Sequence, residues 1–202
     1  VGILERWLPP TGPGLRLDSG VSAGSDVSIH YDAMLAKLIS HGKDRDEARR
    51  RLLQGLAHLS ILGVGTNRDQ LMGILSHADF CEGRVHTAWL ESVSLAKADP
   101  RLLPVARLAA LGWELTRPRT LLPGLPLGWR NSPNRPLQLS VSGETLHWTP
   151  GSEGWSVRYG DTQVQLSLQR HGELGGTLWV DDWRLPLRVA ETPDGWHVHL
   201  PL

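Results

Sequence analysis

Apolar positions in the first half of the chain follow two different periods. Two short apolar runs, Leu15–Val21 and Leu35–Ser40, predict strands, and the prolines and glycines of Pro9–Gly14 predict tight turns before the first of them. A helical period then begins, with apolar residues three or four positions apart at Ala48, Leu52, Leu56 and Leu59. This part of the chain is therefore predicted to be mixed α/β.

Polar residues mark where the predicted helices begin. Asp44 and Glu47 form a capping-box pattern at the start of the first helix. Asn67 is placed to cap a second helix. A third helix is predicted over Arg101–Leu115, where Pro104 falls in the first turn and is tolerated because that turn needs no N–H there.

Beyond the proline-rich segment Thr116–Leu127 the apolar period changes from helical to two. Apolar and polar residues alternate in runs separated by turn signals, and the run that starts at Trp183 is expected to face a core with its apolar residues. With Leu127–Arg130 these runs predict about eight short antiparallel strands. Such strands are expected to close into a barrel around an apolar element, for which the Arg101–Leu115 helix is suited.

Composition excludes several classes of function. A net charge of zero and a pI near 7.3 do not suggest a nucleic-acid partner. Cys81 is the only cysteine, which rules out an internal disulfide, and it is expected to be a buried apolar residue. No apolar run approaches the roughly 20 residues of a membrane-spanning helix.

Histidine is the remaining candidate for metal chemistry. His197 and His199 share one strand face, and His147 lies on the polar face of another strand. No carboxylate or cysteine accompanies them at ligand spacing, so we expect exposed histidines and no metal site. The sequence also contains no GxSxG, Walker or HExxH motif.

Two motifs in Pro9–Gly42, PPxGPGxRxDSGV and YDxMxAKLIxxG, occur in this order. They resemble the C-terminal end of the biotin carboxylase region of acyl-CoA carboxylase α-subunits, and the similarity continues through Asp44–Glu91. By this resemblance Arg16 matches the arginine that lines the biotin site and stabilises the enolate-like ureido ring. A guanidinium suits that role because it is always charged and presents a rigid fork of donors.

Three further residues of the two motifs carry expectations of their own. Gly14 would let the backbone turn tightly beside Arg16. Asp18 is two positions further, so in a strand it shares a face with Arg16 and could orient it, although a plain strand-edge role is as compatible with the sequence. Lys37 lies within an apolar run and is given structural weight only.

A helix followed by a small barrel, entered through Gly128-Trp129-Arg130, resembles the domain that links biotin carboxylase to carboxyltransferase in methylcrotonyl-CoA and propionyl-CoA carboxylases. The entry motif is closer to the methylcrotonyl-CoA and geranyl-CoA types, which implies leucine degradation for the former. The resemblance implies docking onto a carboxyltransferase β-subunit through a hook in Thr116–Leu127. Trp129, Arg130 and Trp179 are the candidate docking residues.

Together these patterns predict an α+β chain. Residues 1–95 would be the C-terminal part of a biotin carboxylase domain, and residues 96–202 a long helix with an eight-stranded β-barrel. Both ends look cut, so the chain is expected to be a piece of an ATP-dependent ligase of the cytoplasm, or of the mitochondrial matrix in a eukaryote. The resemblance implies that ATP, magnesium and bicarbonate bind elsewhere in the full subunit and that biotin is carried on a separate biotinyl domain. The fragment alone is expected to bind none of them and to be inactive.

Two other classes remain open at the level of sequence. One is a free-standing β-barrel module that binds a ligand or an oligonucleotide. The neutral charge and the absence of a basic stripe with interleaved aromatic residues weigh against nucleic acid. The other is a small hydrolase with an Arg/Asp/His site, against which stands the lack of a paired nucleophile and base.

Overall fold

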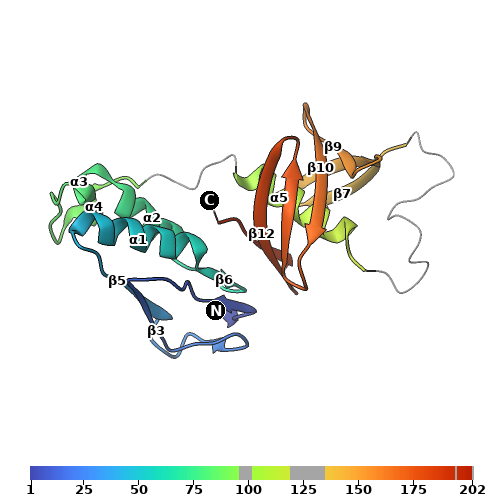
Figure 1. Cartoon of the computed structure of the whole chain (residues 1–202). Helices are drawn as coiled ribbons and strands as arrows, with labels where there is room; N and C mark the ends of the chain where they lie inside the picture. The colour runs from blue at the N-terminus through green and yellow to red at the C-terminus, as the bar shows by residue number, and fades with distance from the viewer. Residues whose placement is uncertain (96–101, 119–134, 194, 202) are drawn as a thin grey trace. The chain divides into compact units, whose positions relative to one another are not determined.

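The computed structural model describes residues 1–95, 102–118, 135–193 and 195–201. The described residues divide into two compact units, which we call the first unit (residues 1–95) and the second unit (the described residues of 102–200). Figure 1 shows the helices and strands of both. The first unit is mixed α/β, as predicted, and the second is one helix with an antiparallel sheet.

The strands of the first unit form three two-stranded antiparallel sheets. The pairs are β1 (Gly2–Ile3) with β4 (Asp26–Val27), β2 (Arg6–Leu8) with β6 (Ser60–Leu62), and β3 (Leu15–Ser19) with β5 (Ala36–Ser40). The two predicted strands correspond to β3 and β5. The other four are too short to show a period of two.

Helix α1 (Arg45–His58) begins where its cap was predicted. Asp44 accepts a hydrogen bond from the N–H of Glu47 at 2.7 Å, and the Glu47 carboxylate accepts from the N–H of Lys43. Helix α2 (Arg68–Ser76) follows Asn67, whose side chain makes no capping hydrogen bond to it. The short helices α3 (Ala78–Cys81) and α4 (Trp89–Ser92) complete the unit.

The first unit has a small core between α1 and α2. Its buried members are Leu56 of α1, Leu59 directly after this helix, and Leu75 of α2. Arginines on α1 add polar contacts at its margin: Arg45 donates to the carbonyl of Cys81 at 3.0 Å, and Arg49 to the carbonyl of Leu75 at 3.1 Å. These bonds satisfy carbonyls at the ends of α2 and α3, which have no partner inside their own helices.

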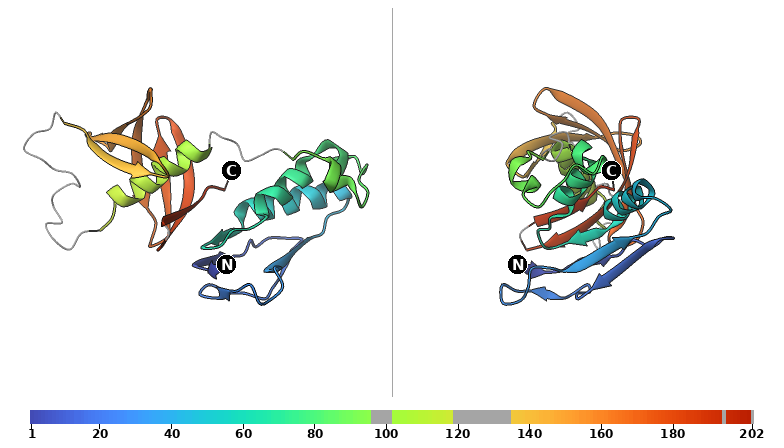
Figure 2. Two further views of the ribbon diagram at one scale, coloured as in Figure 1. Left: turned by 180° about the vertical axis from the view of Figure 1, so that it is seen from behind. Right: turned by 90° about the vertical axis from the view of Figure 1, so that its left-hand side faces the viewer.

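The second unit is a seven-stranded antiparallel sheet in which neighbouring strands follow each other along the chain. Its strands are β7 (Leu137–Val141), β8 (Glu144–Pro150), β9 (Trp155–Tyr159), β10 (Thr162–Arg170), β11 (Gly175–Val180), β12 (Trp183–Thr192) and β13 (Gly195–His199). The sheet curls around helix α5 (Leu102–Leu115), as the two views of Figure 2 show.

The predicted eight-stranded barrel is seen as a half-barrel of seven strands in the residues that the structure describes. The end strands β7 and β13 share no hydrogen-bonded ladder, and α5 packs against both of them. The eighth predicted strand, Leu127–Arg130, lies outside the described residues, as does Arg101 at the predicted start of the helix. At 14 residues, α5 is of ordinary length.

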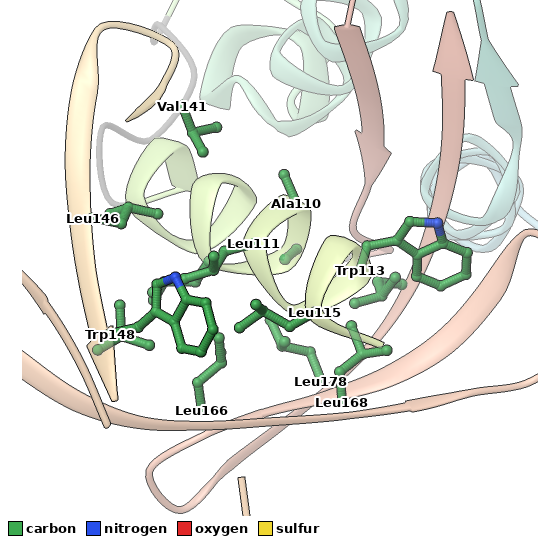
Figure 3. Packing of buried hydrophobic residues seen from close by; sticks show 14 of the residues in the cluster. Ala110, Leu111, Trp113, Leu115, Val141, Leu146, Trp148, Leu166, Leu168 and Leu178 are labelled. Carbon is green, nitrogen blue, oxygen red and sulfur yellow. The ribbon is translucent and has the colours of Figure 1, made fainter. Parts of the chain in front are cut away.

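The core of the second unit lies between α5 and the concave face of the sheet. Figure 3 shows side chains of α5, among them Leu111 and Leu115, facing side chains of the sheet such as Trp148 and Leu178. Leu111 and Leu178 are fully buried. The helix lies close to the sheet at Gly112, where an added Cβ would be 3.3 Å from Leu168.

Two arginines tie α5 to the sheet. In the middle of the helix, Arg107 forms an ion pair with Glu144 and donates to the carbonyl of Ser142 at 2.9 Å. Near its end, Arg170 of β10 stacks 4.0 Å from the Trp113 ring and donates to Trp113 O and, at 3.0 Å, to Thr116 Oγ1. Partial burial lowers the pKa of Arg170 below its ordinary value.

Three sequence expectations about burial are wrong. Cys81 is exposed at the end of α3, because this helix lies at the margin of the small core. His199 is only 4% exposed, because α5 packs against β13. Trp183 is 69% exposed: it is the first residue of β12, directly after the turn that follows Val180, and it lies outside the buried cluster.

Candidate functional site

The paired strands β3 and β5 sort their side chains onto two faces. Leu15 and Leu17 of β3 and Leu38 of β5 are half-buried, and α1 packs against both strands. The alternate residues Arg16, Asp18, Lys37 and Ile39 are exposed on the other face. We call this exposed set the charged face. The period of two therefore places Arg16 and Asp18 together, as predicted.

Asp18 holds Arg16 in a two-pronged ion pair. Arg16 Nε donates to Asp18 Oδ1 at 2.8 Å and Arg16 Nη2 donates to Asp18 Oδ2 at 3.0 Å. This geometry fixes the plane of the guanidinium. The hydrogen bond lowers the pKa of the Asp18 carboxyl below its ordinary value and raises the pKa of the Arg16 guanidinium. Both groups stay charged across the physiological range.

Lys37 is a third member of the charged face. It stands directly opposite Asp18 in the register of β3 and β5, and its positive charge also lowers the pKa of Asp18. The charged face thus carries two cations around one carboxylate. From the sequence, Lys37 is assigned only a structural role. The alternation of the Leu35–Ser40 run already indicated that Lys37 and Leu38 lie on opposite faces of that strand.

Gly14 occupies a position that requires glycine. Its φ is +73°, and an added Cβ would lie 2.5 Å from the carbonyl oxygen of His41 and would also collide with the Arg51 guanidinium. The Gly14 carbonyl accepts a hydrogen bond from the N–H of His41 at 2.8 Å. Gly14 therefore joins the beginning of β3 to the end of β5, two residues before Arg16.

A hollow of about 820 Å³ lies on the opposite side of this strand pair. Leu17 and Leu38 line it from the strands, and Leu56 and Leu71 line it from α1 and α2. Arg16, Asp18 and Lys37 are not among its lining residues. The charged face is instead exposed to solvent, since the side chains of Arg16 and Asp18 are 72% and 48% exposed, so another part of a protein could cover it.

The candidate docking residues of the second unit are placed in part. Trp179 lies on the outer face of the sheet, where it pairs in register with Ser167 of β10 and Arg184 of β12, and it is half-buried. Trp129 and Arg130 lie outside the described residues, and so does most of the predicted hook.

The histidines do not form a metal site in the described ranges. No group of three or more His, Cys, Asp or Glu side chains that could hold a metal ion occurs there. None of the helices described here is long and apolar enough to cross a membrane.

Comparison with known proteins found a family match for the first unit. Residues 1–92 match the family model of the biotin carboxylase C-terminal domain. The matched residues include the whole charged face and Gly14 and end before α5. The family match therefore agrees with the resemblance that the two motifs of Pro9–Gly42 indicated. It does not extend to the second unit.

Curated relatives cover the same part of the chain. The first unit is similar to the human propionyl-CoA carboxylase alpha chain (39% identity over 94 residues) and to biotin carboxylase 1 of Bacillus subtilis (37% over 91 residues). It is also similar to the methylcrotonoyl-CoA carboxylase subunit alpha of Arabidopsis thaliana (38% over 91 residues). These alignments cover 45–46% of this chain and only 13%, 20% and 12% of the three relatives. They support a similarity to biotin-dependent carboxylases in general, and not to one of these three enzymes in particular.

The comparison with solved structures found further similar proteins. The Kluyveromyces lactis urea carboxylase is 40% identical, with 46% of this chain and 8% of that chain covered and a TM-score of 0.44. The biotin carboxylase subunit of pyruvate carboxylase is 35% identical, with 45% and 20% covered and a TM-score of 0.44.

Proposed function

We propose that this chain is part of the α-subunit of a biotin-dependent acyl-CoA carboxylase of the methylcrotonyl-CoA or geranyl-CoA type. Residues 1–95 complete the biotin site of biotin carboxylase, and residues 96–202 link that domain to a carboxyltransferase. The observation that carries the first part is the family match over residues 1–92 together with the oriented Arg16 guanidinium on the charged face. The protein acts in the cytoplasm, or in the matrix of a mitochondrion.

Arg16 is the catalytic residue in this proposal. A guanidinium has five N–H donors, and Asp18 engages two of them, so three remain for an oxygen of a ligand. The permanent positive charge favours the form of that ligand in which the oxygen is negative. Asp18 is a positioning residue, because it holds the guanidinium plane, and Gly14 anchors the strand that carries both.

The cofactors of the proposed enzyme lie mostly outside this chain. Biotin, on its carrier domain, supplies the ureido group that accepts the carboxylate, and its carbonyl oxygen is the group that Arg16 would hold. The exposed charged face fits such a visiting ligand, because its cations are reachable from solvent. ATP, magnesium and bicarbonate are assigned to the rest of the biotin carboxylase domain, so this chain is inactive alone.

The test of the first unit is Arg16→Ala in the full-length α-subunit. We expect loss of most biotin carboxylation with an unchanged melting temperature, since Arg16 is exposed and fills no core. Arg50→Ala is the matched control, because Arg50 is a similarly exposed arginine paired with an aspartate, Asp46, on α1. A fully active Arg16→Ala enzyme would refute the assignment.

The second unit is proposed to dock onto the carboxyltransferase β-subunit. What supports this is its order in the chain, directly after the biotin-carboxylase-like unit, and the resemblance of its helix-and-sheet pattern to linking domains. Trp129, Arg130, the hook and Trp179 are the proposed docking residues. The test is direct binding of the 202-residue chain to a purified carboxyltransferase β-subunit; no binding at micromolar concentration would refute the linking role.

A further inference from the structure

A second hollow lies in the second unit and has a chemistry of its own. It has a volume of about 590 Å³ and is formed by the turn between β8 and β9 together with β10 and the end of β11. Its lining includes the indole of Trp179, on the outer face of the sheet, and two carboxylates, from Glu153 and Asp181. A volume of this size is in the range of sites that hold a ligand or a long side chain.

Backbone contacts hold both rims of this hollow. On one rim, Gly154 has a φ of +146° and an added Cβ would collide with the carbonyl of Leu166, while its own carbonyl accepts from the N–H of Gly151 at 2.7 Å. On the other rim, Asp181 has a φ of +50° and exchanges two hydrogen bonds of 2.8 Å with the backbone of Gln165. Backbone contacts with β10 therefore fix the shape of the hollow on both sides.

The lining selects for positive charge. Glu153 and Asp181 supply carboxylates, Ser167 supplies a hydroxyl, and none of the lining residues in the described part of the chain is basic. Arg184 stands opposite Trp179 on β12 but is not a lining residue. An indole face attracts a cation, and a carboxylate binds a guanidinium or an ammonium group, whereas both carboxylates repel an anion and lose hydration against an apolar ligand.

We propose that this hollow binds a cationic side chain, arginine or lysine, presented by a partner protein. The inference rests on the proposed linking function, since it names the chemistry by which the second unit recognises its carboxyltransferase partner. The aliphatic part of the side chain packs against Trp179, and its charged end pairs with Glu153 or Asp181. In this proposal Trp179, which was chosen from the sequence as a docking residue, contacts the bound cationic side chain directly.

The test uses three short peptides and the 202-residue chain. Acetyl-Gly-Xaa-Gly-amide peptides with arginine, lysine or citrulline at the centre are titrated at millimolar concentration, and the indole N–H signals of the tryptophans are followed by NMR. We expect the arginine or lysine peptide, but not the neutral citrulline peptide, to shift the Trp179 signal. The ranking of the two cationic peptides tells a guanidinium site from an ammonium site.

Variants make the result specific. Glu153→Gln, a nearly isosteric change on an exposed turn, should weaken peptide binding severalfold, and Trp179→Ala should abolish the response of the remaining signals. Trp183→Ala is the control, because Trp183 is exposed on the next strand and does not line the hollow. An equal response to citrulline, or unchanged binding by Glu153→Gln, would overturn the proposal.

Binding to the β-subunit separates this proposal from the linking function. If the unchanged chain binds the β-subunit and the Glu153→Gln/Trp179→Ala variant binds about tenfold or more weakly, both stand. If chain and variant bind equally, the linking function stands and the hollow is not the docking site. If neither binds, the linking function fails, and the peptide titration alone decides whether the hollow takes a cation.

Discussion

At the scale of single residues, the charged face places one carboxylate between two cations. The hydrogen bond from Arg16 is the larger cause of the lowered pKa of Asp18, and the charge of Lys37 adds to it. A lowered pKa in the folded state means that the ion pair is fully formed above the pKa of Asp18 in the unfolded chain. It is lost only as the pH falls through the folded-state pKa.

We therefore expect the Asp18 carboxyl to titrate below the range of ordinary aspartates. The measurement is a carbon-13 NMR titration of the side-chain carboxyl in the intact chain. In Arg16→Ala the midpoint should rise towards the ordinary value, and in Lys37→Ala it should rise less. An Asp18 midpoint that Arg16→Ala leaves unchanged would show that the ion pair is absent in solution.

Sequence reasoning at this scale succeeds where a relation is local. The cap of Asp44 on Glu47 and the shared face of Arg16 and Asp18 depend on residues two or three positions apart, so spacing alone predicts them. It fails where burial depends on distant elements. His199 is covered by a helix about 90 positions earlier in the chain, which the alternation along β13 cannot report.

At the scale of elements, β3 and β5 depend on one glycine. Gly14→Ala should lower the free energy of unfolding of the first unit by about 1–3 kcal/mol, because alanine is strained at this φ and its Cβ meets His41 and Arg51. Gly12→Ala is the control, since the nearest atom to an added Cβ there is 3.9 Å away. Urea unfolding followed by hydrogen exchange in β3 and β5 measures both; equal stability of the two variants would contradict the prediction.

Helix α5 offers a comparison between a buried and an exposed leucine. Leu111→Ala removes a fully buried side chain and should lower the stability of the second unit by about 2–5 kcal/mol. Leu103→Ala changes a residue that is 51% exposed on the same helix and should have an effect within about 0.5 kcal/mol. Thermal unfolding followed by circular dichroism distinguishes them. Similar losses would mean that α5 is not held in the sheet.

The elements that sequence analysis predicted are those with a long enough period. Seven alternating runs became the seven strands of the second unit, and the helical stripe of Ala48–Leu59 became α1. Strands of two or three residues, such as β2 and β6, escape because their partners are far apart in the chain: Arg6 pairs with Leu62. These strands form through pairing between distant parts of the chain, so no local sequence pattern predicts them.

At the scale of the whole molecule, each unit has a buried cluster of its own. Leu56 belongs to the cluster of the first unit and Leu111 to that of the second, and the two clusters share no residue. We therefore expect two separate unfolding transitions. Leu56→Ala should lower only the transition of the first unit, and Leu111→Ala only that of the second.

Hydrogen exchange with mass spectrometry at increasing urea concentration resolves these transitions, because peptides from the two units can be followed separately. A single transition in which both variants shift all peptides together would show that the units unfold as one. The family match bears on the same division, since it ends at residue 92, before the first described residue of α5.

The position of α5 against both end strands of the sheet has a consequence for aggregation. Among the described strands, β7 and β13 are not paired with each other, and an unpaired strand edge is a template on which further chains can add strands. Helix α5 packs against both of these strands on the concave face of the sheet. We therefore expect a change that loosens this helix to free both end strands for pairing with other chains, so that the chain would aggregate as well as lose stability.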